Sequence, residues 1–171
     1  SDDDTAGFAI TESAAATVVA ESAGTDTFDV VLDAQPESDV VLTVTSLATA
    51  EALVDQATLT FTAENWDTGQ TVTVTGVNDD FDRDDGTAVS LAVDAGSSDD
   101  AFDSLADQNV AVTCTDDDTA GFTISESAAA TVVAESAGTD TFAVVLDARP
   151  ESDVVLTVTS NAAAEATVDQ A

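Results

Sequence analysis

The chain has 171 residues, and its 35 acidic residues against two arginines give a formal net charge of -33. A surface this acidic excludes nucleic acid, whose backbone needs basic contacts, and anionic membrane surfaces, and it favours cationic partners such as divalent metal ions. Because 44% of the residues are apolar, most of them Val or Ala, the chain can bury a core and is not a disordered acidic tail.

Short strands are predicted throughout the first 115 residues. Val- and Thr-rich runs that alternate apolar with polar residues, at regular spacing and with turn residues between them, are typical of an antiparallel sandwich. We predict a first strand split into residues 7–11 and 16–20, then strands at 27–34, 39–46, 57–63, 70–77, 87–95 and 109–115. These seven strands predict an all-β fold, an immunoglobulin-like antiparallel β-sandwich.

The beginning of the chain is repeated near its end. A shift of 114 residues aligns 2–57 with 116–171, and seven of the 56 pairs differ, which leaves 49 identical. A period of this length is that of a whole domain. We therefore expect tandem repeats placed end to end: an acidic linker at 1–4, a complete repeat at 5–115, an acidic linker at 116–118 and the first half of a second repeat at 119–171.

The half repeat raises a question of its own, because half a sandwich cannot bury its own sheet face. One alternative is that the chain is an internal piece of a longer polypeptide. The other is that a second subunit completes the domain by strand addition. The sequence leaves both alternatives open.

Strand parity predicts that four acidic segments meet at one end of the complete repeat. Successive antiparallel strands alternate in direction, so their connecting loops alternate between the two ends of the sandwich. The end that holds Asp116–Asp118 therefore also holds the loop 78–86, the connection containing Asp55 and the loop containing Glu21. Two charges 4 Å apart repel by about 1 kcal/mol in water and by about 4 kcal/mol at an effective dielectric of 20, so such a cluster needs a cation.

The available ligands indicate which cation. Ca²⁺ binds about six to eight oxygen atoms from carboxylates and carbonyls. The chain has no histidine and one cysteine, Cys114, which leaves no ligand set for structural zinc or for copper. We therefore predict Ca²⁺, with Mg²⁺ as an alternative. Acids elsewhere fit a solvated surface adapted to high salt, and parity puts these at the opposite end: Asp33, Glu37, Asp94, Asp99 and Asp100.

Three stretches together resemble a known family. DDDTAGF, VVAESAGTDTF and LTFTAENWDTGQTVTVTGVNDD are similar to the Calx-beta domain, a module of sodium–calcium exchangers and of large bacterial surface proteins. The resemblance covers the complete repeat and the half repeat. It implies a seven-stranded immunoglobulin-like sandwich that binds Ca²⁺ at one end.

The resemblance also implies a set of metal ligands. These are Glu21, Asp55, Asp79, Asp80, Asp82, Asp84, Asp116, Asp117 and Asp118, and by repetition Asp2, Asp3, Asp4, Glu135 and Asp169. Where the exchanger loop has a Glu, this loop has Arg83 or Asp84, which leaves the number of ions open.

Other residues that could carry chemistry fit structural roles. Cys114 alternates with Val110 and Val112, so we expect it in the core. We expect Trp66 to cover the core, although a lone Trp can also stack on carbohydrate. The Phe residues flanked by alternating strand residues are predicted to be buried: Phe8, Phe28, Phe61 and Phe122. With no His, Lys or Tyr to act as base or nucleophile, we expect no enzyme activity.

The function we expect is that of a Ca²⁺-binding spacer in a long, repetitive extracellular adhesin or bacterial surface filament. Neighbouring repeats of the same polypeptide would be its partners, with filament contacts to other copies as a further option. Ca²⁺ would make the linkers rigid. No run of 18 or more apolar residues occurs, so we expect no membrane insertion. The alternatives are a Ca²⁺-sensing regulatory module and a surface domain that binds carbohydrate or protein.

Overall fold

A computed structural model describes residues 4–169, so the predicted ligands Asp2 and Asp3 lie outside the described residues. The chain forms two compact units. The first comprises the described residues up to Asp79 together with Arg83–Asp117, and the second comprises Asp80–Asp82 together with the described residues from Asp118 onward. Within 4–169 all regular structure is β, and no helix is present that could cross a membrane.

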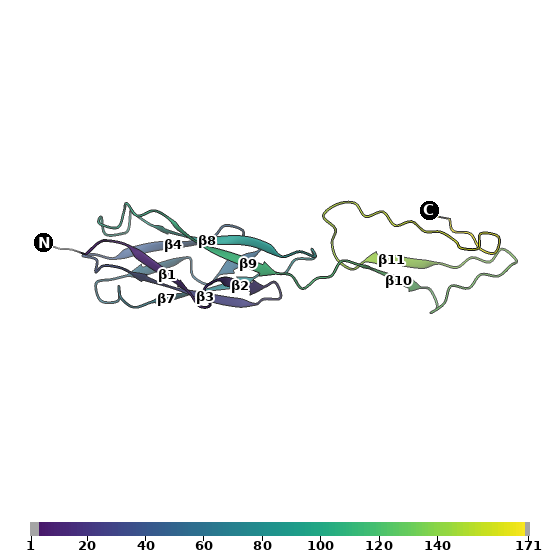
Figure 1. Cartoon of the computed structure of the whole chain (residues 1–171), viewed down its shortest axis with the longest axis horizontal. Coiled ribbons are helices and arrows are strands. Elements are labelled where there is room, and N and C mark those ends of the chain that lie inside the picture. Colours follow the sequence, from purple (N-terminus) through teal and green to yellow (C-terminus); the bar gives the residue numbers. More distant parts are fainter. Residues whose placement is uncertain (1–3, 170–171) are drawn as a thin grey trace. The chain divides into compact units, whose positions relative to one another are not determined.

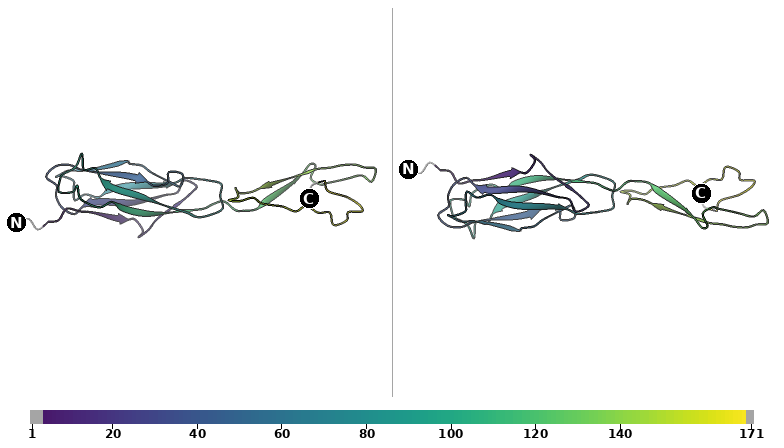
Figure 2. Two further views of the ribbon diagram at one scale, coloured as in Figure 1. Left: turned by 90° about the horizontal axis from the view of Figure 1, so that it is seen from above. Right: turned by 90° about the horizontal axis from the view of Figure 1, so that it is seen from below.

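The first unit is a sandwich of two sheets, whose strands run lengthwise along it (Figures 1 and 2). Its strands are β1 (Phe8–Glu12), β2 (Thr17–Ala20), β3 (Thr25–Leu32), β4 (Val40–Ser46), β5 (Ala52–Val54), β6 (Thr58–Phe61), β7 (Gln70–Gly76), β8 (Asp85–Val93) and β9 (Gln108–Thr115). One sheet has the order β1-β3-β7-β5 and the other β2-β9-β8-β4-β6. The predicted all-β sandwich is confirmed. Every pairing is antiparallel except that of β2 with β9.

Alternating side chains of both sheets form one apolar core. In β3, Phe28, Val30 and Leu32 are buried while the residues between them are not, which is the period of two that a half-buried strand requires. Full burial of each such side chain contributes about 1.5–3 kcal/mol. Phe8, Phe61 and Cys114 are buried as predicted, and Trp66 packs against the core from its edge.

The split first strand places its two halves in different sheets. β1 pairs with β3, whereas β2 pairs with β9. The Glu12 carboxylate accepts hydrogen bonds from the backbone N–H and the hydroxyl of Thr17, at 3.2 and 3.0 Å, and so holds the turn between the halves. The three-residue strand β5 was not predicted, because so short a run shows no alternation and exists only through its pairing with β7.

The second unit contains one strand pair, β10 (Phe122–Glu126) with β11 (Phe142–Leu146). Residues 80–82 pack in this unit: the Arg149 N–H donates to the Asp80 carbonyl at 2.6 Å, and the Arg149 guanidinium lies 4.7 Å from the centre of the Phe81 ring. Phe122, predicted to be buried, is 51% exposed. That prediction was wrong because nothing among the described residues covers this side chain as the core covers Phe8.

Candidate metal centre

Strand pairing brings several acids to one end of the first unit. The parallel register Ala20↔Thr115 makes β2 and β9 end together, and the Glu21 N–H donates to the Thr115 carbonyl at 3.0 Å. Glu21 and Asp116 therefore follow their strands side by side.

The start of β8 and the end of β7 lie at the same end of the unit. β8 begins opposite the end of β9, in the register Asp85↔Cys114. β7 ends at Gly76, where an added Cβ would lie 2.2 Å from the Ala20 carbonyl oxygen. Only glycine allows this close approach of the Ala20 backbone to β7, and the approach brings the residue after Ala20 to the loop that carries Asp79.

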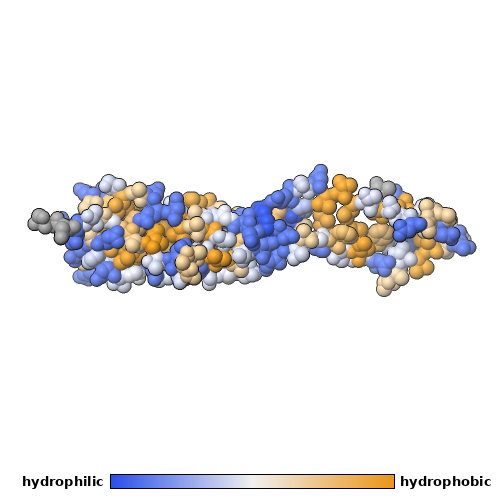
Figure 3. Space-filling model, in the orientation of Figure 1, coloured by the Kyte–Doolittle hydropathy of each residue, from blue (hydrophilic) through white to orange (hydrophobic). Residues whose placement is uncertain are grey.

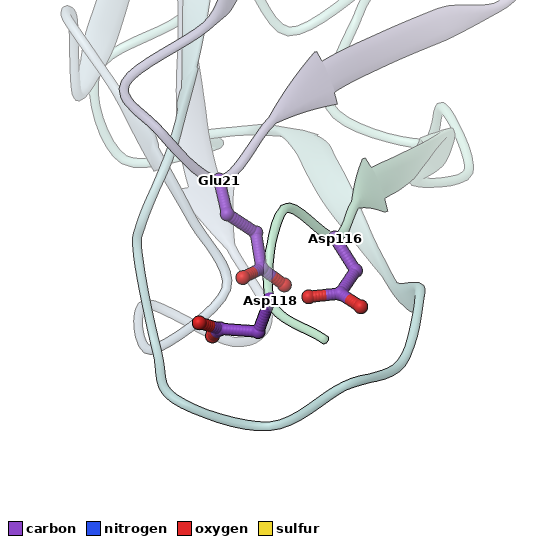
Figure 4. Close-up of side chains that lie close together, drawn as sticks. All are labelled: Glu21, Asp116 and Asp118. Carbon is purple, nitrogen blue, oxygen red and sulfur yellow. The ribbon is translucent and has the colours of Figure 1, made fainter. Parts of the chain in front are cut away.

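Carboxylates converge on Glu21. Oxygen atoms of Glu21, Asp79 and Asp85 lie within 4.8 Å of one another, and a Glu21 oxygen lies within the same distance of an Asp116 oxygen. Figure 4 shows the Glu21 side chain extending from the chain after β2 toward the segment after β9, with the Asp116 carboxylate turned toward it. We name Glu21, Asp79, Asp85 and Asp116 the acidic cluster.

Glu21 is the most unusual member of the acidic cluster. It is 1% exposed, and neither carboxylate oxygen has a hydrogen-bond partner among the described residues. Burial raises the pKa of the Glu21 carboxyl above its ordinary value of 4.5, and the charges of Asp79, Asp116 and Asp117 raise it further. The Asp79 N–H opposes this change without reaching normal hydrogen-bond geometry. An unpaired buried carboxylate costs several kcal/mol, so this position requires a proton or a cation.

Asp85 and Glu51 were not among the predicted ligands. Asp85 forms an ion pair with Arg83, Nε to Oδ1 2.7 Å, and this hydrogen bond lowers the pKa of Asp85. Its other oxygen is buried and has no hydrogen-bond partner in the described chain. The pKa of Glu51 is raised by burial first and then by the charges of Asp85 and Asp79.

Glu51, and not the predicted Asp55, is the acid that the connection after β4 brings to this end. The register Ala52↔Gly76 places Glu51 beyond the end of β7, whereas Val54↔Val74 places Asp55 alongside the strand. There the exposed Asp55 carboxylate accepts a hydrogen bond from the Thr73 N–H at 2.8 Å. The β5–β7 register would have revealed this, but β5 gave no signal in the sequence.

The remaining predicted ligands have varied positions. Asp84 accepts a hydrogen bond from the Asp116 N–H at 2.9 Å, which ties the loop before β8 to the segment after β9. Asp80, Asp82 and Asp118 belong to the second unit, where Asp82 accepts from the Ala120 N–H at 2.6 Å. Exposed positions are occupied by Asp4, Glu135 and Asp169.

The donor set of the acidic cluster fits a hard cation. Ca²⁺ binds oxygen at about 2.3–2.6 Å, so two oxygens on one ion lie up to about 5 Å apart. The oxygens of Glu21, Asp79 and Asp85, all within 4.8 Å of one another, meet this condition. Sulfur is not available, because the buried Cys114 thiol donates to the Glu51 carbonyl at 3.3 Å and its pKa is raised, chiefly by burial. The residues present therefore fit Ca²⁺, to which Glu21 would offer a buried carboxylate.

Asp99, at the other end of the unit, gives a contrast. It was predicted to be a solvated surface acid, and this was wrong: it is buried. Its carboxylate accepts hydrogen bonds from the backbone N–H groups of Glu37, Ser38 and Ala101 at 2.7, 3.1 and 2.9 Å, which lower its pKa. Asp99 is a buried acid with its own donors, and Glu21 is a buried acid without them.

Comparison with known proteins shows only distant likeness. No protein-family model matches the chain, and no curated protein matches it. Similar solved structures include the E. coli chaperone DraB (9% identity, 64% of this chain and 55% of that chain, TM-score 0.45) and S-layer protein SbsC domains 4 and 5 (19%, 66% and 54%, 0.40). A third is CBD12 from CALX1.2 (14%, 69% and 47%, 0.41).

The chain spans about half the length of each of these three proteins. The Calx-beta resemblance therefore has a distant structural match but no match to a family model. Likeness at this level carries no argument about function, which has to come from the acidic cluster and the repeat.

Proposed function

We propose that this chain is a Ca²⁺-binding structural spacer of a long, repetitive extracellular adhesin or surface filament. The observation that carries the proposal is the buried Glu21 carboxylate, whose unpartnered oxygens lie among those of Asp79 and Asp85. Glu21, Asp79, Asp85 and Asp116 would hold the ion. Bound Ca²⁺ supplies the positive charge that this end of the sandwich lacks.

The repeat supports a spacer role. Two copies that share 49 of 56 aligned residues suit a protein in which length matters more than the individuality of each module. In the first unit, the Asp116 N–H is bound to Asp84, so the start of the DDD segment is joined to the loop before β8. Ca²⁺ held there would restrict the linker, and neighbouring repeats of the same polypeptide are the partners we propose.

An extracellular location suits a site of this kind. Extracellular Ca²⁺ modules bind at about 10⁻⁴–10⁻³ M, a range that matches Ca²⁺ levels outside cells better than the trace levels inside them. Where Ca²⁺ is scarce, the carboxylates of the acidic cluster would repel one another, because the positive charge beside them comes from Arg83 alone.

Calorimetric titration of the chain, stripped of metal with EDTA and then dialysed, tests the proposal. We expect Ca²⁺ to bind, Mg²⁺ to bind more weakly, and Glu21→Gln to weaken Ca²⁺ binding by about tenfold or more, since one charged ligand is worth more than 1.4 kcal/mol. The control is Glu64→Gln, an exposed acid in the turn after β6, which should bind as the wild type does. Equal affinity of the wild type and Glu21→Gln would remove the acidic cluster as the site.

A further inference from the structure

The first unit has a single basic side chain within residues 4–79 and 83–117, that of Arg83. The other arginine of the chain, Arg149, belongs to the second unit and lies over Phe81. Figure 3 shows hydrophilic residues gathered near the middle of the view, at the end of the first unit that carries the acidic cluster. The position of Arg83 therefore decides which of these carboxylates has a compensating charge.

Arg83 binds one of the two oxygens of Asp85. Its Nε lies 2.7 Å from Asp85 Oδ1, and the Arg83 side chain is 37% exposed while that of Asp85 is 18% exposed. Asp85 Oδ2 is buried without a hydrogen-bond partner among the described residues, and an oxygen of Asp85 lies within 4.8 Å of oxygens of Glu21 and Asp79. Asp85 is thus shared between the guanidinium and the acidic cluster, and one of its oxygens is left to bind an ion.

The compensation by Arg83 does not reach Glu21. The hydrogen bond from Arg83 lowers the pKa of Asp85, and the charge of Arg83 opposes the burial and the acidic neighbours that raise the pKa of Glu51. Burial is the main cause of the raised pKa of Glu21, and every neighbouring charge that shifts it further is negative. Both Glu21 oxygens also lack a hydrogen-bond partner in the described chain. Arg83 therefore serves one side of the cluster and leaves the Glu21 side for a bound cation.

We propose that Arg83 is a built-in counter-ion that regulates the acidic cluster, an inference that rests on the Ca²⁺ site of the proposed function. Without the ion, Arg83 holds the Asp85 carboxylate in place and reduces the repulsion at this end of the sandwich. When Ca²⁺ is bound, the positive charge of Arg83 opposes it and retains Oδ1 of Asp85, so Asp85 contributes one oxygen. Arg83 thus makes the metal-free form more stable and the affinity for Ca²⁺ lower than the carboxylates alone would give.

This exchange of affinity for stability suits an extracellular site. A site that works at about 10⁻⁴–10⁻³ M Ca²⁺ does not need the highest affinity its carboxylates can reach. It does need a sandwich that stays folded before the ion binds. The two effects have opposite signs, so they separate a counter-ion from an arginine that only supports the fold, whose loss would lower stability without tightening Ca²⁺ binding.

Calorimetric titration of the full chain, stripped of metal with EDTA and then dialysed, tests the proposal together with thermal melting in EDTA. Arg83→Gln should bind Ca²⁺ about tenfold more tightly than the wild type, the factor expected when a positive charge about 6 Å from a divalent ion is removed in water. Its melting temperature in EDTA should be several degrees lower, because Asp85 loses its counter-ion. Arg83→Lys keeps the charge and should bind Ca²⁺ much as the wild type does.

The matched control is Arg149→Gln, which changes the net charge by the same amount and introduces the residue found at the equivalent position 35. It should bind Ca²⁺ as the wild type does. If Arg83→Gln does not fold without metal, folding it in Ca²⁺ and titrating with a chelator gives the same comparison of affinities.

The outcomes separate this inference from the proposed function. A wild type that binds no Ca²⁺ would overturn both. Ca²⁺ binding by the wild type that is equal or weaker in Arg83→Gln would overturn the role of Arg83 and leave the Ca²⁺ site standing. An equal gain in Arg149→Gln would also overturn it, because net charge and not the position of Arg83 would then set the affinity.

Discussion

Glu21 and Asp99 are both buried acids, and they differ in what surrounds the charge. Three backbone N–H groups point at the Asp99 carboxylate, so its negative charge is stabilised by the fold itself. Glu21 has no hydrogen-bond partner in the described chain and faces the carboxylates of Asp79 and Asp85. A charge in that setting destabilises the folded state unless a proton or a metal ion joins it.

The first prediction concerns pH in the absence of metal. The pKa values of Glu21 and Glu51 are raised above 4.5 in the folded state, so the folded chain binds protons there more tightly than the unfolded chain does. The free energy of unfolding should therefore rise as the pH falls from 7 toward about 5. Asp99 and Asp26 have pKa values lowered below 3.8, so their contribution is lost on further acidification.

Thermal melting in EDTA across this pH range measures the effect. The melting temperature should pass through a maximum on the acidic side of neutrality, and added Ca²⁺ should move that maximum toward neutral pH by competing with protons. A steady fall in melting temperature from pH 7 to pH 5 in EDTA contradicts the assignment of Glu21 as an unpaired buried carboxylate.

The second prediction is an inversion of stability by Glu21→Gln. Without metal, the neutral amide removes the buried charge and can donate to the neighbouring carboxylates, so the variant should be more stable than the wild type by about 1–3 kcal/mol. With Ca²⁺ at 100 times its Kd, the wild type gains about 2.7 kcal/mol and the variant gains much less. Chemical denaturation in EDTA and in Ca²⁺ measures both, with Glu64→Gln as the control. A variant that is less stable than the wild type in EDTA would show that the charge is already compensated within the fold.

At the scale of elements, the alternation of apolar residues and the alternating direction of the strands predicted the fold, but they predicted only part of the acidic cluster. The Val/Thr runs of β3, β4, β7 and β9 were visible because each strand is long enough to show a period of two. The structure places Asp79 and Asp116 each beside Glu21, at the end of the sandwich where strand direction predicted these acids to meet.

The positions of the remaining acids depend on strand pairings that no pattern in the sequence reveals. β5 has three residues, and its register with β7 decides that Glu51, and not Asp55, reaches the end of the sandwich. β8 begins at Asp85, before the point where apolar and polar residues start to alternate along this strand. Asp85 was therefore not predicted to lie at the start of a strand or in the cluster. Residues 131–134 match β2 residue for residue without forming a strand, so strand formation there is decided by a partner and not by local preference.

The third prediction belongs to the loops at the end opposite the acidic cluster. Asp99 lies in the connection between β8 and β9, and its hydrogen bonds to the Glu37 and Ser38 N–H groups tie that connection to the loop after β3. Both carboxylate oxygens of Asp99 accept hydrogen bonds from backbone N–H groups, and in Asp99→Asn an NH₂ donor replaces one of these oxygens. Because a donor would then face a backbone donor, the variant should melt several degrees lower than the wild type. The adjacent Asp100→Asn is the control, because Asp100 is exposed. Equal melting temperatures for the two variants would contradict a structural role for Asp99.

For the whole molecule, charge is the dominant constraint. The net charge is -33, and the chain has two arginines, of which Arg83 is paired with Asp85 and Arg149 lies over Phe81. Repulsion between exposed carboxylates acts over about 10 Å at 0.1 M salt. Side chains cannot supply the missing positive charge. The Ca²⁺ that we propose would supply part of it, and its effect on the shape of a repetitive protein should be largest at a linker made of three aspartates.

Small-angle X-ray scattering of the chain in Ca²⁺ and in EDTA, at the same ionic strength, tests the central claim most directly. We predict that Ca²⁺ narrows the distribution of interatomic distances and fixes the maximum dimension, while EDTA broadens both. Replacement of Asp116, Asp117 and Asp118 by Asn should abolish the Ca²⁺ response and leave the sandwich folded. Identical scattering of the wild type in Ca²⁺ and in EDTA would contradict a spacer that calcium makes rigid.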